Sequence, residues 1–281
     1  MPLFMFLSGW VMIYSNFNVS FTSFMESKIK RLVIPFIAWY LFNYIMLDYS
    51  KIMTLDDYLL QLIRAPDNGL WYLWILFLCQ IILFVSHKLE KYIGDFYLII
   101  IFAIIKIIPL HFLGFDLLKW HFGFFCFGYF ISKNRIHFIR YKNIAMIVST
   151  FLFPVLAFGW HRTRQPAMML YIEKYTTSEI SLNIIQQVYN YIVPISGIGF
   201  AFFITSLLIS HFKKIGNYLS TLGLYTLDIY AIHLYFIGKI VIGNGLTNVF
   251  ANFLFSLALS LVVSNILRRS SIVSKIFLGI K

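Results

Sequence analysis

Nine apolar runs, separated by short polar loops, set the strongest limit on what this sequence can fold into. A helix that crosses a bilayer needs about 20 mostly apolar residues, because the hydrocarbon core is about 30 Å thick. The runs cover residues 1–14, 31–47, 69–87, 94–112, 116–132, 143–160, 184–210, 221–242 and 246–267. Only 12% of the 281 residues are charged, whereas a soluble domain carries about 25%. We therefore predict an all-α fold, a polytopic bundle of transmembrane helices.

The loops between these runs alternate in charge. The positive-inside bias of membrane proteins predicts that the strongly basic loops face the cytoplasm, together with the C-terminus. The lysines and arginines of these basic loops are Lys28, Lys30, Arg31, Lys88, Lys91, Lys133, Arg135, Arg140, Lys142, Lys213, Lys214, Arg268, Arg269, Lys275 and Lys281. The opposite loops carry fewer basic residues, Lys51, Arg64, Lys119, Arg162, Arg164 and Lys174. This topology explains most of the net charge of +12, so we expect membrane lipids and no nucleic acid as partners.

The first apolar run differs from the others in length. Residues 1–14 are too few to cross a bilayer unaided, and the charge alternation places Met1 outside. One further helix upstream would remove both difficulties. We therefore expect a single domain over 1–281 that has about nine of ten helices and is truncated at its N-terminus. Ser8 and Gly9 are small residues that would allow a close approach between helices.

Ionisable side chains inside the predicted spans are candidates for function, because charge is unfavourable in lipid. They are Lys106, His121, Asp228, His233 and Lys239. For the two lysines a structural role, with the ammonium group reaching toward an interface, is favoured. Asp228 and His233 are five residues apart, about 140° around a helix, so we expect no direct contact between them. Tyr230 lies near His233 and extends a polar strip along an otherwise apolar helix.

A basic run precedes the second apolar run. Two interpretations of this run are equally open, a topology anchor and a phosphate site. Its cations are Lys28, Lys30 and Arg31. Lys28 and Arg31 are three residues apart and share one helix face, and a guanidinium group suits phosphate oxygens. Pro35, one turn later, would kink the helix and free backbone carbonyls near such a site.

Other motifs leave their alternatives open. Trp71 follows Asn68 and Gly69 at a predicted outer helix start, which is typical of an interfacial aromatic belt. His121 lies just inside an outer boundary, where an interhelical hydrogen bond and a functional role are equally open.

The two cysteines lack CxxC spacing and no HExxH motif occurs, so we expect no metal.

Five segments together resemble the membrane-bound acyltransferase-3 family, and they fall in order along the whole chain. MPLFMFLSGW at 1–10 resembles the family's second-helix signature, and KIKRLVIP at 28–35 is similar to its basic motif leading into a proline. LWYL at 70–73 resembles its LWFL motif. Gly128-Tyr129 and YTLDIYAIH at 225–233 resemble its later signatures.

The resemblance implies an enzyme that transfers an acetyl or other acyl group from acyl-CoA to a hydroxyl of a cell-surface or exported polysaccharide, or of its lipid-linked precursor. It implies acetyl-CoA as the donor, with Arg31, Lys28 and Lys30 as the residues that bind it. The family's proposed catalytic histidine belongs to a first helix that this sequence lacks, so the catalytic residue is unknown. His233 and Tyr230 are the remaining candidates. The residues expected to line the substrate path are Trp71, His121 and Asp228.

Two alternatives to an active transferase remain at this point. The chain is either a component of polysaccharide export or flipping without transferase activity, or an inactive truncated product. In each case we expect a multi-pass protein of the bacterial cytoplasmic membrane, and the oligomeric state is not predicted.

Overall fold

The computed structural model of the chain describes residues 1–46, 53–64, 66, 70–158, 160, 172, 178–243 and 245–280. Within these ranges the regular backbone is entirely helical, with no strand, which confirms the predicted all-α class. Several loop residues used for the topology prediction lie outside the described ranges: Lys51, Asn68, Gly69, Arg162, Arg164, Lys174 and Lys281.

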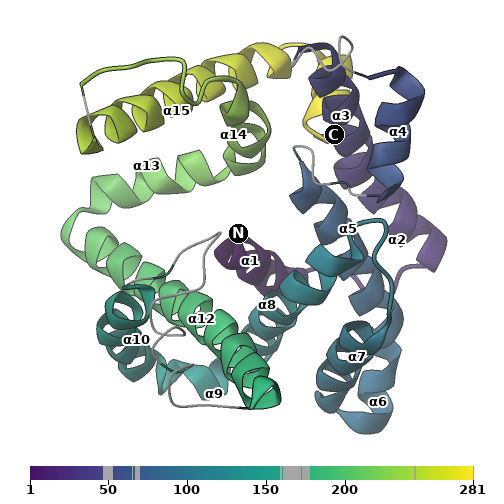
Figure 1. Cartoon of the computed structure of the whole chain (residues 1–281), viewed down its shortest axis with the longest axis vertical. Coiled ribbons are helices and arrows are strands. Elements are labelled where there is room, and N and C mark those ends of the chain that lie inside the picture. Colours follow the sequence, from purple (N-terminus) through teal and green to yellow (C-terminus); the bar gives the residue numbers. More distant parts are fainter. Residues whose placement is uncertain are drawn as a thin grey trace. The chain divides into compact units, whose positions relative to one another are not determined.

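Figure 1 shows the order of the helices. In chain order they are α1 (Pro2–Met12), α2 (Phe21–Lys28), the π-helical turn η1 (Ile29–Val33), α3 (Ile34–Met46), α4 (Leu55–Arg64), α5 (Trp71–Ser86), the 3₁₀ turn η3 (His87–Leu89), α6 (Glu90–Ile93), α7 (Phe96–Ile107), α8 (Phe115–Lys133), α9 (Arg135–Ile139), α10 (Lys142–Ala157), α12 (Glu179–His211), α13 (Lys213–Gly223), α14 (Thr226–Ile232), the 3₁₀ turn η4 (His233–Tyr235), α15 (Leu246–Arg268) and α16 (Ser271–Phe277).

Four helical stretches in the described part of the chain are long and apolar enough to cross a membrane. They are Phe21–Met46, Trp71–Ile93, Glu179–His211 and Leu246–Arg268. Shorter apolar helices occupy three more of the predicted spans, at Pro2–Met12, Phe96–Ile107 and Lys142–Ala157. The chain is therefore a helical membrane protein.

The predicted span at 221–242 is not one continuous helix. It divides into the end of α13, the seven-residue α14 and the single turn η4, and residues 236–243 are not helical. Hydropathy does not reveal such a break, because the apolar residues continue through it. Most of the non-helical residues that follow η4 are exposed.

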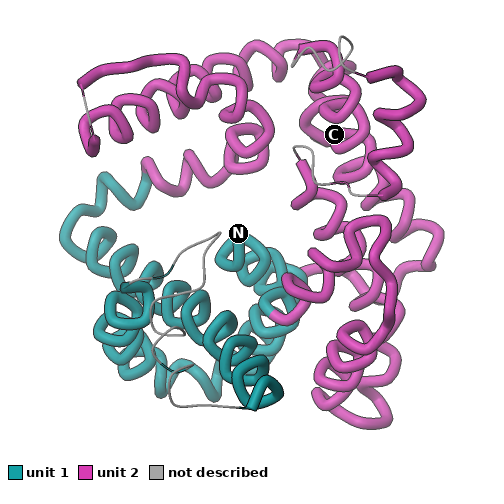
Figure 2. The backbone as a smooth tube through the Cα atoms, in the orientation of Figure 1, with its two compact units in different colours: residues 1–13, 124–217 teal, residues 14–123, 218–281 magenta. Residues whose placement is uncertain are grey.

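The chain divides into two compact units, which Figure 2 distinguishes by colour. Unit 1 contains residues 1–13 and 124–217, and unit 2 contains residues 14–123 and 218–281.

Unit 1 is held together by close packing between helix backbones. A Cβ built on Gly9 of α1 would lie 1.9 Å from the carbonyl oxygen of Phe125 in α8, and one built on Gly128 would lie 1.9 Å from that of Phe6. Only glycine permits such an approach, and small residues at helix interfaces are typical of membrane proteins. The close approach predicted for Gly9 is confirmed.

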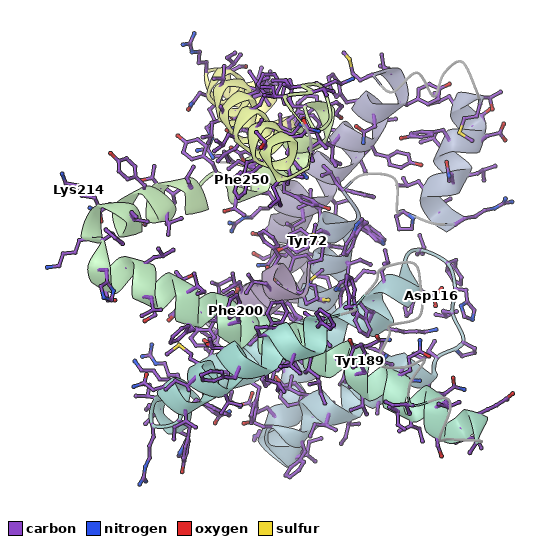
Figure 3. All side chains as sticks on the ribbon, turned by 60° about the vertical axis from the view of Figure 1, so that its left-hand side comes forward. Tyr72, Asp116, Tyr189, Phe200, Lys214 and Phe250 are labelled. Carbon is purple, nitrogen blue, oxygen red and sulfur yellow. The ribbon has the colours of Figure 1, made fainter. Side chains whose placement is uncertain are left out.

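The second contact in unit 1 joins α10 and α12. Tyr189 of α12 is buried, and its hydroxyl donates a 2.6 Å hydrogen bond to the carbonyl of Leu156 in α10. Further along, the rings of Phe153 and Phe200 stack with centroids 5.3 Å apart. Figure 3 labels Tyr189 and Phe200 on α12. Unit 1 is thus mostly an apolar helix assembly.

Unit 2 is built around α5. The turn η1 and helix α3 both pack against α5, while α14 packs on α15 and α16 packs on both α3 and α15. At about 1.5 Å per residue, the 16 residues of α5 extend about 24 Å, close to the thickness of a hydrocarbon core. Helix α5 therefore connects the predicted outer end of this unit, at Trp71, with its predicted cytoplasmic end, at Ser86.

Candidate functional site

All the site residues expected from the sequence lie in unit 2. They are Lys28, Lys30, Arg31, Trp71, His121, Asp228, Tyr230 and His233. Among the described residues no group of three or more His, Cys, Asp or Glu side chains is arranged to hold a metal ion.

His233 lies at the break that follows α14. Its Nδ1 atom is 3.0 Å from the carbonyl oxygen of Ile229 and 2.8 Å from that of Tyr230. Because a carbonyl oxygen only accepts hydrogen bonds, Nδ1 carries a proton, and the tautomer with the lone pair on Nε2 is the one that these contacts favour. The half-buried imidazole is therefore oriented with its basic nitrogen directed away from its own helix.

The backbone around His233 is also held in place from α15. The hydroxyl of Ser256 donates a 3.1 Å hydrogen bond to the carbonyl of His233, which also accepts from the backbone N–H groups of Phe236 and Ile237. The carbonyl of His233 is therefore held both by its own segment and by α15.

Two consecutive residues in the first turn of α5 contact side chains on two different helices, α8 and α14. Trp71 stacks on His121, with ring centroids 4.8 Å apart and an interplanar angle of 29°. The next residue, Tyr72, makes an edge contact with Tyr230 at 5.4 Å. Tyr72 is labelled in Figure 3. Consecutive α5 residues thus link the His121 side of the unit with α14, where the Tyr230 ring lies 6.1 Å from that of His233.

His121 has a buried nitrogen without a partner. The side chain is 5% exposed, and among the described residues no group makes a hydrogen bond to its Nδ1 atom. A buried polar atom left in this state is unfavourable by about 1–3 kcal/mol, and such atoms in native proteins call for a ligand, a water or a functional reason.

Asp228 is buried and strongly bound. Its Oδ2 atom accepts hydrogen bonds from Arg268 Nε at 2.9 Å and Arg268 Nη2 at 2.7 Å, and also one from the hydroxyl of Ser264. The Arg268 guanidinium also lies 4.1 Å from the ring centroid of Tyr225 and donates to the carbonyl of Leu224. The structure thus places Asp228 in a clamp between α14 and α15.

Sequence reasoning missed the role of Arg268, which it treated as a cytoplasmic anchor. A signal was present, because the predicted topology places both Asp228 and Arg268 near the cytoplasmic ends of consecutive spans. A buried carboxylate needs a paired cation, and Arg268 was the residue at the matching depth.

The basic run forms an irregular helical turn. In η1 the N–H of Ile34 donates to the carbonyl of Ile29, which is π-helical spacing, and Pro35 follows with no N–H of its own. Such π-turns occur frequently at functional sites. The π-turn precedes Pro35, and helix α3 continues through this proline to Met46.

The three cations of this run have different surroundings. Lys30 is exposed and forms an ion pair with Glu26. Lys28 is half-buried, with its ammonium nitrogen 4.8 Å from the centroid of Phe24. Arg31 is exposed, and no acidic side chain in the described part of the chain pairs with it. Lys28 and Arg31 are therefore the two cations available to an anionic ligand, whereas Lys30 is neutralised by its neighbour.

The C-terminal segment packs directly on this turn. A Cβ built on Gly279, whose φ is +64°, would lie 2.4 Å from the carbonyl oxygen of Arg31. The indole N–H of Trp39 in α3 donates a 2.8 Å hydrogen bond to the carbonyl of Phe277 at the end of α16. The segment from Phe277 to Gly279 therefore supports the backbone that carries Arg31.

The ammonium nitrogen of Lys106 lies 5.7 Å from the ring centroid of Phe102 on the same helix. Lys239 is exposed in the non-helical segment that follows η4.

These features define a helical membrane protein in which one unit contains an oriented histidine, a buried ion pair and a basic π-turn. The chain belongs to acyltransferase family 3, because its sequence matches that family's model, described as an acyltransferase domain, over residues 1–269. The protein is thus a membrane acyltransferase in general terms. Comparisons with curated proteins and with solved structures gave no match.

Proposed function

We propose that this protein transfers an acyl group, acetyl in the first instance, from acyl-CoA to a hydroxyl of a cell-surface or exported polysaccharide or its lipid-linked precursor. It does so as a multi-pass protein of a bacterial cytoplasmic membrane. The observation that carries the proposal is the arrangement along α5. The basic turn η1 packs against this helix. In its first turn, Trp71 stacks on His121, whose buried Nδ1 has no partner among the described residues. The next residue, Tyr72, contacts Tyr230, whose ring lies 6.1 Å from that of the oriented His233.

The donor side of the site is the η1 turn. The residues fit the phosphate groups of CoA, since Arg31 is exposed with no acidic partner among the residues that the structure describes, and Lys28 lies one turn away on the same face. Arginine binds phosphate oxygens through a fork of donors, and lysine supplies a point charge. When bound, acyl-CoA supplies an acyl group on a good thiolate leaving group.

The chemical role in this chain belongs to His233. Its Nε2 lone pair accepts the proton of the acceptor hydroxyl as the hydroxyl oxygen attacks the acyl carbon. The carbon–sulfur bond breaks, and the proton passes to the departing sulfur. The bond from Nδ1–H to the backbone fixes the tautomer that this step requires. Tyr230 forms the wall beside the imidazole.

The acceptor side is the Trp71–His121 pair. The indole of Trp71 stacks on the imidazole of His121, whose buried Nδ1 atom has no protein partner among the described residues. A sugar hydroxyl supplies the hydrogen bond that this atom lacks.

The test is transfer of labelled acetyl from acetyl-CoA to glycan in proteoliposomes, with CoA binding measured on the same preparations. We expect His233→Gln to lower the transfer rate about 100-fold or more while CoA affinity is unchanged, because general-base catalysis contributes about 10²–10⁴-fold. His211→Gln, which changes an exposed histidine at the end of α12, is the control. Equal rates in His233→Gln and the unchanged protein would refute the role of His233.

Deletion of the gene separates this function from the export alternative. Loss of glycan acetylation with normal export supports the transferase. Loss of export with normal acetylation supports an export component.

A further inference from the structure

An open cavity of about 490 Å³ lies at the connection formed by η3 and α6, outside the site described above. It is lined by His87, Lys88, Glu90, Lys91 and Tyr92, which belong to η3, α6 and their boundary. The charge pattern predicts that this connection faces the cytoplasm.

The cavity presents two cations without a paired acid. Lys88 and Lys91 are three residues apart in helical backbone, and both are exposed. The neighbouring carboxylate of Glu90 lies 3.1 Å from Nδ1 of His87. No ion pair between either lysine and an acidic side chain occurs within the described ranges. Like charges on one helix face destabilise each other, so an anion bound between them relieves a repulsion that is built into the sequence.

A row of stacked rings connects this cavity with the basic turn η1. The ring of Phe24, beneath the Lys28 ammonium group, stacks on Phe84 at 4.1 Å. Phe84 lies 6.0 Å from Phe17, and Phe17 stacks on His87 at 4.2 Å. These partly buried rings place the cavity and the turn near each other in unit 2, at the end of α5 opposite Trp71.

We propose that this cavity is a second phosphate subsite, which binds the 3′-phosphate on the ribose of CoA while Arg31 and Lys28 hold the diphosphate. The inference rests on the proposed function, because it assigns a further part of the same donor. CoA carries phosphate groups at two separate positions of its nucleotide, and the surface offers two separate pairs of cations. A phosphate monoester carries nearly two charges at neutral pH, which suits two ammonium groups. The ring of Tyr92, 78% exposed at the cavity wall, offers a face to the purine.

The experiment compares CoA with dephospho-CoA, which lacks only the 3′-phosphate, by calorimetric binding to the full chain in nanodiscs of phosphatidylcholine. We expect the unchanged protein to bind CoA at least about tenfold more tightly than dephospho-CoA, a difference of about 1.4 kcal/mol, because charge-assisted contacts to the 3′-phosphate are lost in the latter. The double variant K88A/K91A should bind both ligands with the weaker affinity. The matched control K213A/K214A removes the same charge from another predicted cytoplasmic loop, where Lys214 projects from α13 (Figure 3), and should keep the discrimination.

The other outcomes contradict either the proposed function or the phosphate subsite. Failure of the unchanged protein to bind either ligand overturns the proposed function and this inference together. Binding of CoA without discrimination, discrimination that K88A/K91A retains, or equal loss in K213A/K214A overturns the subsite alone.

A second arm repeats the measurement in nanodiscs that contain phosphatidylglycerol, to separate the nucleotide from lipid headgroups. If K88A/K91A loses association with the anionic lipid but still discriminates between the two ligands, the lysines bind headgroups and the nucleotide assignment is wrong.

Discussion

The two units of this chain bury different kinds of groups. In unit 1 the tight contacts are between helix backbones at Gly9 and Gly128, and the buried polar side chains are the serines Ser132 and Ser196. Unit 2 buries His121 and Asp228, together with Asn43 and five serines. Polar groups inside a membrane protein are unfavourable unless they are paired or used. The difference indicates that unit 1 is a scaffold and that unit 2 carries the chemistry.

The largest effect should come from Gly9→Leu in unit 1. A side chain at this position meets the carbonyl of Phe125, so α1 and α8 must separate along their length. We expect a loss of more than about 5 kcal/mol, comparable with the whole stability of a small domain, and hence almost no folded protein in size-exclusion chromatography. Gly223→Leu, at a position with no atom within 4 Å of the added Cβ, should give a normal yield. A normal yield for Gly9→Leu would break the scaffold interpretation.

The next effect tests the buried ion pair of unit 2. Arg268→Ala leaves the carboxylate of Asp228, which is 3% exposed, without its cation, and we expect a loss of about 3–5 kcal/mol in thermal unfolding. Asp228→Ala should be milder, because the Arg268 side chain is 29% exposed and turns to solvent. Arg269→Ala, which changes an exposed neighbour, should have little effect. The reverse order of the two ion-pair variants would contradict the assignment of the buried partner.

A third effect concerns the support of the basic turn. Gly279→Val pushes its side chain into the carbonyl of Arg31, so donor binding should weaken severalfold with an unchanged maximal rate. Gly238→Val is the control, because Gly238 also has a positive φ but no atom within 4 Å of the added Cβ. Equal changes in the KM for acetyl-CoA would show that backbone strain, and not the contact with Arg31, is responsible.

The smallest expected effect is a change in stability at His121. It distinguishes a structural role of this side chain from a role in binding the acceptor. His121→Phe keeps a ring stacked on Trp71 and removes a buried nitrogen that has no partner among the described residues. We expect stability to rise by about 1 kcal/mol, while the KM for the glycan acceptor increases. His111→Phe, at an exposed residue bound to Asp116, should leave both quantities unchanged. A loss of stability in His121→Phe would show that the nitrogen serves the fold.

Much of the fold follows from the sequence, because membrane thickness fixes the length of an apolar helix. The all-α class and the close approach at Gly9 could be predicted from apolar runs and small residues. The break after α14 could not, since Ile237, Ile240 and Val241 continue the apolar pattern through non-helical backbone. The glycines at 238, 243 and 245, all with positive φ, were the available signal.

The sequence predicts which residues belong to the site, but it does not predict which of them contact each other. The cost of intramembrane charge singled out Asp228 and His233, and the basic run singled out Arg31. Which side chain pairs with which depends on tertiary packing. The stacking of Trp71 on His121 joins residues 50 positions apart, and Arg268 reaches Asp228 across 40. No local pattern encodes these pairings.

Photo-crosslinking tests the central claim most directly, because it needs binding and no turnover. A CoA analogue that carries its photoreactive group on the adenine is applied to the purified chain in nanodiscs, and the labelled peptides are identified by mass spectrometry with excess CoA as competitor. The account predicts CoA-protected labelling within residues 14–123 and 218–281, centred on η1 and the segment around His87. CoA-protected labelling confined to residues 124–217 would contradict the assignment of the chemistry to unit 2.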